Sequence, residues 1–480
     1  MRLQKSWFRK SLLLMAVRSL FSALAWSFLI QPTGVALAVD SDPRSAAPTP
    51  APTLALTPAF EQYREVPTPP NVQVVMTELE GPVFATEEGL TLYKWPQHKL
   101  RNGYSGEPPG IPACYGQPKL TTAGLMSPYP AGVPLPDRDQ RPACTDLWRP
   151  FFAKADAQPV GKWTVLERKD ARLQWAFDEQ ALYTSARDQQ AGDTFGGTRR
   201  KHDGDSPAIR VPIGPPPLVP PGVAVKTTSI GRLLTTTKNE SLYAYEGESA
   251  AALHCTEQCL KQFSPLKAPA LAKPIGEWSI IEREAGVRQW AFRDSPVYTH
   301  PDDTHSWSLE GSDEAGWVNL FTQRAPAPPG SFTVQETLAG LVLADSAGKS
   351  IYVYRCGDDS MDQLACDHPN DTQVYRLAMC GGGDAERCRA FWPYVPATEG
   401  EISTSRAWSV VSIDPKTGHY AREGDDDAVR VWAYRQRPVY TYSGDVLAGD
   451  LNGAGTGEWR GKRNGLLAFW LRDDFMEGIE

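Results

Sequence analysis

The densest set of candidate oxygen ligands lies near the end of the chain. Asp445, Asp450 and Asn452 fall within eight residues of a glycine-rich stretch. Carboxylate and amide oxygens in a loop are ligands that Ca²⁺ prefers, although the spacing does not match a helix–loop–helix calcium site. The alternative is a turn in which the acids accept hydrogen bonds from backbone N–H groups. Calcium binding is therefore a hypothesis for this loop.

Histidines and acids come closest together in the segment His300-Pro-Asp-Asp-Thr-His305. A loop could bring His300 and His305 onto one transition metal, but a solvated turn is the simpler interpretation. The chain contains none of the motifs H-E-x-x-H, G-x-S-x-G or G-x-x-x-x-G-K-[S/T]. We therefore assign no catalytic residue and do not expect an enzyme. No motif requires a cofactor, and calcium or a transition metal remains the open alternative.

The eight cysteines all lie beyond residue 113. An even number in an exported protein indicates disulfides rather than a soft-metal site, and no pair has the C-x-x-C-H form of a haem attachment. The Cys-x3-Cys spacing in the middle of the chain predicts a short helical turn that is crosslinked to itself. The expected pairs are Cys114–Cys144, Cys255–Cys259, Cys380–Cys388 and Cys356–Cys366.

The N-terminal residues 1–38 have the composition of a secretory signal peptide. Basic residues precede a largely apolar stretch, and Ala36-Leu-Ala38 has the A-x-A form of a cleavage site. An uncleaved membrane anchor is the alternative, and it is the only membrane attachment that we consider. No cysteine lies near the cleavage point, so a lipid could not be attached through a cysteine there. The net charge of −8 gives no basic surface for nucleic acid. We expect a periplasmic or secreted protein.

One stretch occurs three times, as Gln174–Tyr183, Gln289–Tyr298 and Val431–Tyr440, each time with a tryptophan eight residues before the final tyrosine. Such self-similarity predicts a repeat protein. Proline-rich stretches predict a tether at 39–68 and linkers at 206–221 and 324–330. The expected units are a first repeat at 69–205 with an insertion at about 117–142, a second repeat at 222–323 and a third repeat at 331–480.

Within each repeat, apolar and polar residues alternate around glycine-containing turns, which is typical of β-hairpins. We predict an all-β protein of three tandem, disulfide-stapled domains. Each domain is expected to be a small β-sandwich or partly open barrel, built from two three-stranded meanders. A six-bladed propeller of half-repeats is the alternative, but the cysteine pairs and proline-rich breaks group the halves in twos.

Tyrosines and acids recur at the ends of the half-repeats. Tyr440-Thr-Tyr442-Ser-Gly-Asp445 is the complete form, whereas Tyr93-Lys-Trp95 reaches His98 where a carboxylate is expected. This pattern resembles the bacterial secreted-repeat lipoproteins named for a Y-x-(F/W/Y)-x-x-D motif, although the lipid-anchor cysteine of that family is missing. The resemblance implies no established activity. The other residues matched to the motif are Tyr183, Asp188, Tyr243, Tyr245, Tyr298, Asp303, Tyr352 and Tyr354.

The motif has a structural interpretation. A tyrosine and the aromatic residue two positions later point to the same face of a strand, and the acid follows where a turn offers N–H groups. Buried aromatics with a turn-capping acid are therefore expected. Cation ligation by the acids and stacking of exposed aromatics on sugar rings are the functional alternatives.

These observations favour an exported, non-catalytic binding or scaffold protein of the cell envelope or the extracellular space. Its expected partner is an envelope component, either a protein or a polysaccharide. The alternative is a periplasmic metal-binding or redox accessory protein.

Overall fold

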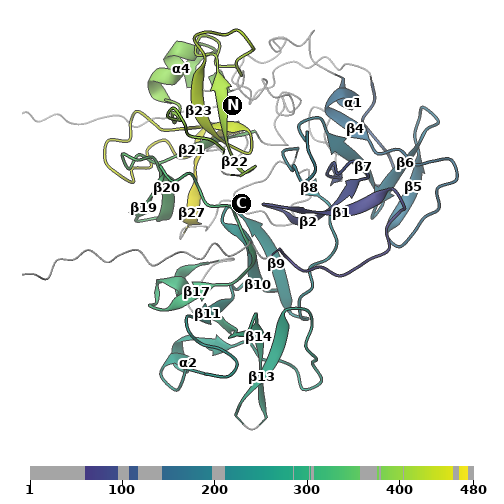
Figure 1. Ribbon diagram of the computed structural model, residues 1–480, viewed down its shortest axis with the longest axis vertical. Coiled ribbons are helices and arrows are strands. Elements are labelled where there is room, and N and C mark those ends of the chain that lie inside the picture. The colour runs from purple at the N-terminus through teal and green to yellow at the C-terminus, as the bar shows by residue number, and fades with distance from the viewer. Residues whose placement is uncertain are drawn as a thin grey trace, which may run out of the picture. The chain divides into compact units, whose positions relative to one another are not determined.

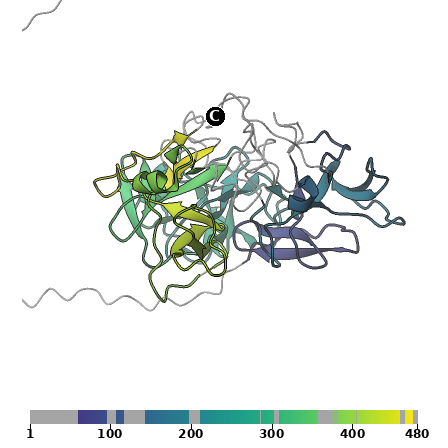
Figure 2. The same ribbon diagram turned by 90° about the horizontal axis from the view of Figure 1, so that it is seen from above.

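The computed structural model describes residues 60–95, 107–116, 143–196, 211–284, 286–301, 303, 308–356, 376–377, 380–403, 405–457 and 464–473. Within these ranges the protein is all-β, with several small antiparallel sheets and short helices. The strands of each repeat gather into one group (Figure 1), and after a quarter turn the purple-to-blue strands of the first repeat can again be told apart from the green-to-yellow strands of the third (Figure 2). No helix in the described ranges is long and apolar enough to cross a membrane.

The second half of each repeat is a three-stranded meander, as predicted. Its first strand begins at a tryptophan, and its second strand contains the recurring tryptophan. A two-residue turn then leads into the third strand. In the second repeat this turn is Arg293-Asp294, whose φ angles of 47° and 68° are those of the primed hairpin turns that match strand twist. The strands are β5 (Trp163–Glu167), β6 (Leu173–Phe177), β7 (Gln180–Ser185), β13 (Trp278–Glu284), β14 (Val287–Phe292), β15 (Ser295–Pro296), β16 (Tyr298–Thr299), β22 (Trp408–Ile413), β23 (Val429–Tyr434) and β24 (Arg437–Tyr440).

The first half of each repeat differs from the predicted meander. It has a regular hairpin, but its third strand touches the hairpin through one isolated bridge, such as Thr235–Ser241, and then leaves to pair with the second half. The third strand is therefore shared between the two halves. The strands are β1 (Val72–Thr77), β2 (Gly81–Thr86), β3 (Tyr93–Lys94), β9 (Val223–Thr228), β10 (Gly231–Thr236), β11 (Tyr243–Tyr245), β19 (Thr333–Thr337), β20 (Gly340–Ala344) and β21 (Tyr352–Cys356).

Each half also exchanges a closing strand with the other half. In the second repeat, β12 (Ser264–Pro265) follows the first half but pairs with β16, and β17 (Trp317–Asn319) and β18 (Phe321–Arg324) follow the second half but pair with β11 and β10. The first repeat has β4 (Trp148–Pro150) on β7 and β8 (Val211–Pro212) on β3. The third repeat has β25 (Thr456–Gly457), β26 (Asn464–Ala468) and β27 (Trp470–Asp473), of which β26 pairs with β21 and β27 with β20.

This exchange interlocks the two halves of a repeat. A propeller blade satisfies its backbone hydrogen bonds within itself, whereas each half here completes the sheet of the other. The arrangement therefore does not fit six independent blades. In each of the three stretches, the two halves therefore complete one another's sheets.

The sequence predicts a linker at 206–221. Its described portion, residues 211–221, is part of the fold rather than a free linker. Val211–Pro212 form β8, and Pro217 bridges to Tyr63. The N–H of Arg64 donates to the carbonyl of Pro216 at 2.8 Å. A proline lacks the N–H group that a central strand needs, but its carbonyl can still accept a hydrogen bond, as that of Pro216 does here.

Among the described residues, the first and second repeats each contain two hydrophobic clusters and the third contains three. In the second repeat, one contains Trp278 and Trp290, packed edge to face with ring centroids 6.3 Å apart. The other contains Tyr243 and Phe263, again edge to face at 5.9 Å. The aromatic residue that follows the second cysteine of each repeat packs in this way on the first-half tyrosine, as Trp148 on Tyr93, Phe263 on Tyr243 and Trp392 on Tyr352.

Three of the expected disulfides are present, namely Cys114–Cys144, Cys255–Cys259 and Cys380–Cys388. A short helix contains the second cysteine of each pair: α1 (Cys144–Leu147), α2 (Cys259–Gln262) and α4 (Ala385–Phe391). Cys255 lies before α2 rather than inside it, so the second-repeat disulfide ties a segment without regular secondary structure to the start of the helix. The expected Cys356–Cys366 pair lies outside the residues whose side chains are described.

Candidate functional site

The motif tyrosines and acids form buried pairs that cross between the two halves of a repeat. In the first repeat, the hydroxyl of Tyr93 donates to Asp188 at 2.7 Å, and that of Tyr183 donates to Glu107 at 2.7 Å. The two tyrosines face each other across the β3–β7 ladder. Each tyrosine therefore bonds the acid that follows the tyrosine of the opposite half.

The second repeat has the same crossed arrangement. Tyr243 donates to Asp303 at 2.8 Å, and Tyr298 donates to Glu248 at 2.8 Å. Tyr243 and Tyr298 are ladder partners between β11 and β16. A glutamate thus replaces the expected aspartate at one of the two positions without loss of the contact.

In the third repeat, Tyr352 donates to Asp445 at 2.7 Å and pairs across the ladder with Tyr440. The N–H of Gly453 approaches the same hydroxyl at 3.3 Å. A Cβ at Gly453 would lie 2.5 Å from the Trp392 ring, so this close approach requires glycine. Asp358, the first acid after Tyr354 in the sequence, lies outside the described residues.

The acids also cap the loops that follow them, as expected from the sequence. Asp188 accepts the N–H of Phe195 at 2.8 Å, and Asp445 accepts the N–H of Asn452 at 2.9 Å. Glu248 accepts the N–H of His254 at 3.0 Å. Each carboxylate therefore holds a loop six or seven residues long and a tyrosine from the other half of the repeat.

An arginine lies beside the second-half tyrosine of every repeat. Arg283 donates to Tyr298 at 2.7 Å and to Gln289 at 3.0 Å, and it also donates to the carbonyl of Cys255. Arg168 makes the matching contacts in the first repeat, to Gln174 at 2.5 Å and to the carbonyl of Cys114 at 2.6 Å.

The third repeat has Val431 where the other repeats have this glutamine, and Arg376 supplies the cation from another part of the chain. Its guanidinium carbon lies 4.7 Å from the centre of the Tyr440 ring, and it donates to Tyr394 at 2.7 Å. A cation beside the tyrosine is therefore kept although its origin in the chain changes.

Burial controls the protonation of these groups. It raises the pKa of the Glu107, Asp188 and Asp303 carboxyls to about 7 each, and this effect exceeds the opposing influence of the tyrosine hydrogen bonds. Burial and the adjacent carboxylate also raise the pKa of Tyr243 and Tyr93 well above the usual value. The tyrosines are therefore protonated donors at neutral pH and are unsuited to act as bases or nucleophiles.

The structure brings the motif aromatics together in the cores. Trp95 stacks on Tyr183 with ring centroids 4.6 Å apart. Tyr245 packs on Trp317 at 5.3 Å. Tyr442 packs on Trp392 at 4.5 Å, and Tyr354 is buried in the same cluster. They contribute to packing rather than to an exposed row of sugar-stacking rings.

The candidate metal ligands make other contacts. Asp450 accepts the N–H groups of Val446 and Leu447 at 2.8 Å each, and the side-chain amide of Asn452 donates to the carbonyl of Gly444 at 3.1 Å. His300 packs its ring against Phe263 at 4.7 Å, and His305 lies outside the described residues. In the part of the chain that the structure describes, no group of three or more His, Cys, Asp or Glu residues is placed to hold a metal ion.

Sequence reasoning missed Glu107 and the arginines. The acid was expected near His98, but the partner of Tyr183 is Glu107, which lies in a loop with no motif around it. Arg168 and Arg283 did leave a signal, because each stands five residues after a recurring tryptophan and six before a recurring glutamine. Arg376 left none, since it precedes the cysteine pair instead.

Comparisons with protein-family models, with curated proteins and with solved structures each found no match. The crossed tyrosine–carboxylate pairs therefore have to be interpreted from their own geometry.

Tyr243→Phe tests whether these pairs stabilise the fold. The variant keeps the ring but leaves the buried Asp303 carboxyl without its donor at 2.8 Å, so the free energy of unfolding should fall by about 1–3 kcal/mol. Urea denaturation followed by tryptophan fluorescence measures it. Tyr442→Phe is the control. The Tyr442 ring is half-buried, and its hydroxyl makes no hydrogen bond within the described residues, so the substitution should change stability by less than about 0.5 kcal/mol. Equal losses in both variants would contradict a specific role for the pair.

Proposed function

We propose that this protein is an exported, non-catalytic repeat protein that serves as a binding or scaffold module of the cell envelope or the extracellular space. The supporting observation is the crossed pairing itself. The motif tyrosines and acids, which are the side chains best suited to chemistry, are buried and hydrogen-bonded to one another, and the acids also hold loops. The resemblance to the secreted-repeat lipoproteins is part of the same proposal.

Export is supported by the disulfides. Cys114–Cys144, Cys255–Cys259 and Cys380–Cys388 belong to an oxidising environment. The basic and apolar N-terminal stretch is consistent with secretion. A periplasmic or extracellular location follows as a proposal.

Elemental analysis of the mature protein, purified from its own compartment without chelators, tests the proposal against a metal-binding role. We expect less than 0.1 equivalent of calcium or first-row metal per chain. One equivalent or more that survives dialysis would overturn the non-metal interpretation and return attention to the loop of Asp445 and Asp450.

Binding is tested separately by co-sedimentation with insoluble envelope polysaccharide. Tyr243→Phe, with its buried change, should bind as well as the wild type per folded molecule. If it loses binding while remaining folded, the tyrosine–carboxylate pairs belong to a ligand site and the scaffold interpretation is wrong.

A further inference from the structure

The two strands of the first hairpin are joined by an equivalent turn in each repeat. A threonine hydroxyl donates to the carbonyl of the glycine that opens the next strand, from Thr77 to Gly81 at 2.8 Å, and Thr228–Gly231 and Thr337–Gly340 repeat this contact at 2.8 and 2.9 Å. The residues between differ: Glu78-Leu79-Glu80 in the first repeat, Ser229-Ile230 in the second and Leu338-Ala339 in the third.

The apolar residues of these turns have opposite surroundings. Leu338 is 98% exposed, whereas Leu79 is only 5% exposed. Leu79 belongs to the hydrophobic cluster of the third repeat, together with Trp408 and Trp432. A turn of the first repeat thus supplies a core residue to the third.

Polar contacts surround this insertion. The Glu78 carboxylate accepts the N–H of Arg406 at 2.9 Å and that of Ala407 at 3.2 Å, immediately before β22. Glu80, whose side chain is 1% exposed, forms an ion pair with Arg435 at 3.0 Å. Arg435 sits in the two-residue turn of the third repeat and also donates to the carbonyl of Thr194 at 2.8 Å.

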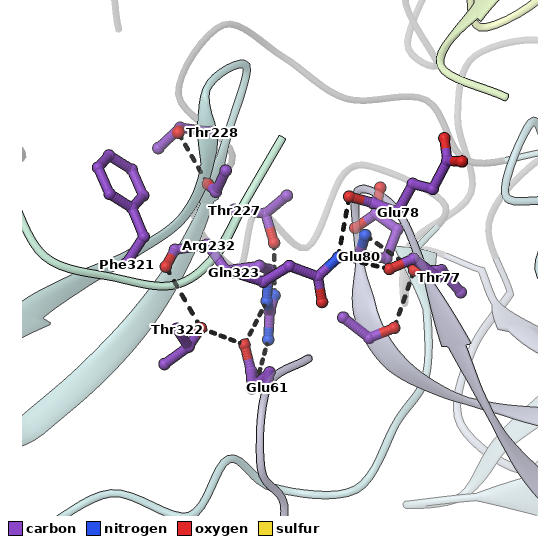
Figure 3. Close-up of polar contacts among 12 residues, drawn as sticks. Glu61, Thr77, Glu78, Glu80, Thr227, Thr228, Arg232, Phe321, Thr322 and Gln323 are labelled. Carbon is purple, nitrogen blue, oxygen red and sulfur yellow. Dashed lines mark hydrogen bonds and ion pairs between the residues drawn. The ribbon is translucent and has the colours of Figure 1, made fainter. Parts of the chain in front are cut away.

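The second repeat holds the same turn from another direction. The side-chain amide of Gln323 donates to the carbonyls of Thr77 and Glu78, at 2.6 and 2.9 Å (Figure 3). Nearby, the buried Glu61 carboxylate accepts two hydrogen bonds from Arg232, both at 2.9 Å, and one from Thr322 at 2.6 Å (Figure 3). The three repeats therefore meet at one hairpin turn.

We infer that the turn Glu78–Leu79–Glu80 is a clasp that joins the first repeat to the second and the third, so that the three repeats unfold as one cooperative unit. Separate domains on proline-rich linkers would unfold independently. Opening this turn instead exposes Leu79 and separates the buried Glu80 from Arg435, which penalises unfolding of either repeat alone. The inference concerns assembly of the chain and does not rest on the proposed function.

Leu79→Asp tests the clasp, with Leu338→Asp as the matched control at the equivalent exposed turn. We expect one urea transition for the wild-type protein, seen together by tryptophan fluorescence and far-ultraviolet circular dichroism. Leu338→Asp should keep that transition and its midpoint, whereas Leu79→Asp should split it into at least two. A wild type with separate transitions, or a Leu79→Asp transition identical to that of Leu338→Asp, overturns the inference.

A gentler set of variants covers the case in which Leu79→Asp does not fold. Glu80→Gln, Arg435→Gln and the double variant form a double-mutant cycle across the junction. We expect the midpoint shifts of the single variants to sum to clearly more than the shift of the double variant. Additive shifts would show that the pair does not couple the repeats, and the clasp would be rejected.

Discussion

Replacing Trp290 by alanine should lower the free energy of unfolding by about 3–5 kcal/mol. The ring is 2% exposed and lies in the second-repeat cluster with Trp278, Phe292 and Val297. Its own strand cannot close the space left by the indole, because β14 is paired to β13 at Ile280 and its N–H at Trp290 is bonded to Leu266. The loss therefore includes both the transfer of the ring to water and the cavity.

Urea denaturation of Trp290→Ala beside Leu271→Ala makes this measurement specific. Leu271 lies in the same repeat but is 93% exposed, so its truncation should change stability by less than about 0.5 kcal/mol. Trp175→Ala is a second positive case, since Trp163 and Trp175 repeat the edge-to-face geometry at 6.4 Å. A Trp290→Ala protein as stable as Leu271→Ala would show that the recurring tryptophan is not a core residue in solution.

Stability should fall as the pH rises from about 4 to about 7. Burial raises the pKa of Glu107, Asp188 and Asp303 to about 7 in the folded protein, against usual values of roughly 4 in an unfolded chain. Between these values the folded state binds more protons than the unfolded state. The contribution is therefore complete below about pH 4 and is lost as the pH passes 7, at about 1–4 kcal/mol for each group.

Urea unfolding at pH 5 and pH 8 checks the sign, with a higher free energy of unfolding expected at pH 5. Asp303→Asn keeps an oxygen acceptor for Tyr243 but removes one titrating group, so the difference between the two pH values should shrink. The opposite trend, with greater stability at pH 8, would mean that Tyr93, Tyr183 and Tyr243 stabilise the ionised carboxylates more than burial disfavours them. An unchanged difference in Asp303→Asn would assign the effect to other groups.

A different set of carboxyl groups lowers the stability of the protein at acidic pH. The N–H groups of Leu447 and Val446 lower the pKa of the Asp450 carboxyl, and Arg172 lowers the pKa of Asp170 to about 2. Groups with lowered pKa values contribute stability above their usual titration range and lose it as the pH falls through the folded value. Their contribution is therefore lost at low pH, whereas the contribution of the buried acids is lost as the pH rises.

Local patterns in the chain were sufficient to predict the all-β class, the second-half meanders and three disulfides. The stretch Gln289–Tyr298 predicted a strand, a turn and a strand because its apolar residues alternate and its tryptophan recurs with its tyrosine. Cys255 and Cys259 are close in sequence, so chain geometry alone brings them within 5.2 Å between Cα atoms. Such features depend on interactions between near neighbours.

The tertiary structure decided which side chains meet. Tyr93 and Asp188 are 95 residues apart, and Glu80 and Arg435 are 355 apart. The motif spacing places each acid after its own tyrosine, which gives no reason to expect a bond to the tyrosine of the other half. That bond exists because β3 of the first half pairs with β7 of the second half, which places the two tyrosines opposite each other, and Leu79 is buried because its turn reaches the third repeat. Both arise from packing between distant segments, and no local pattern of residues encodes them.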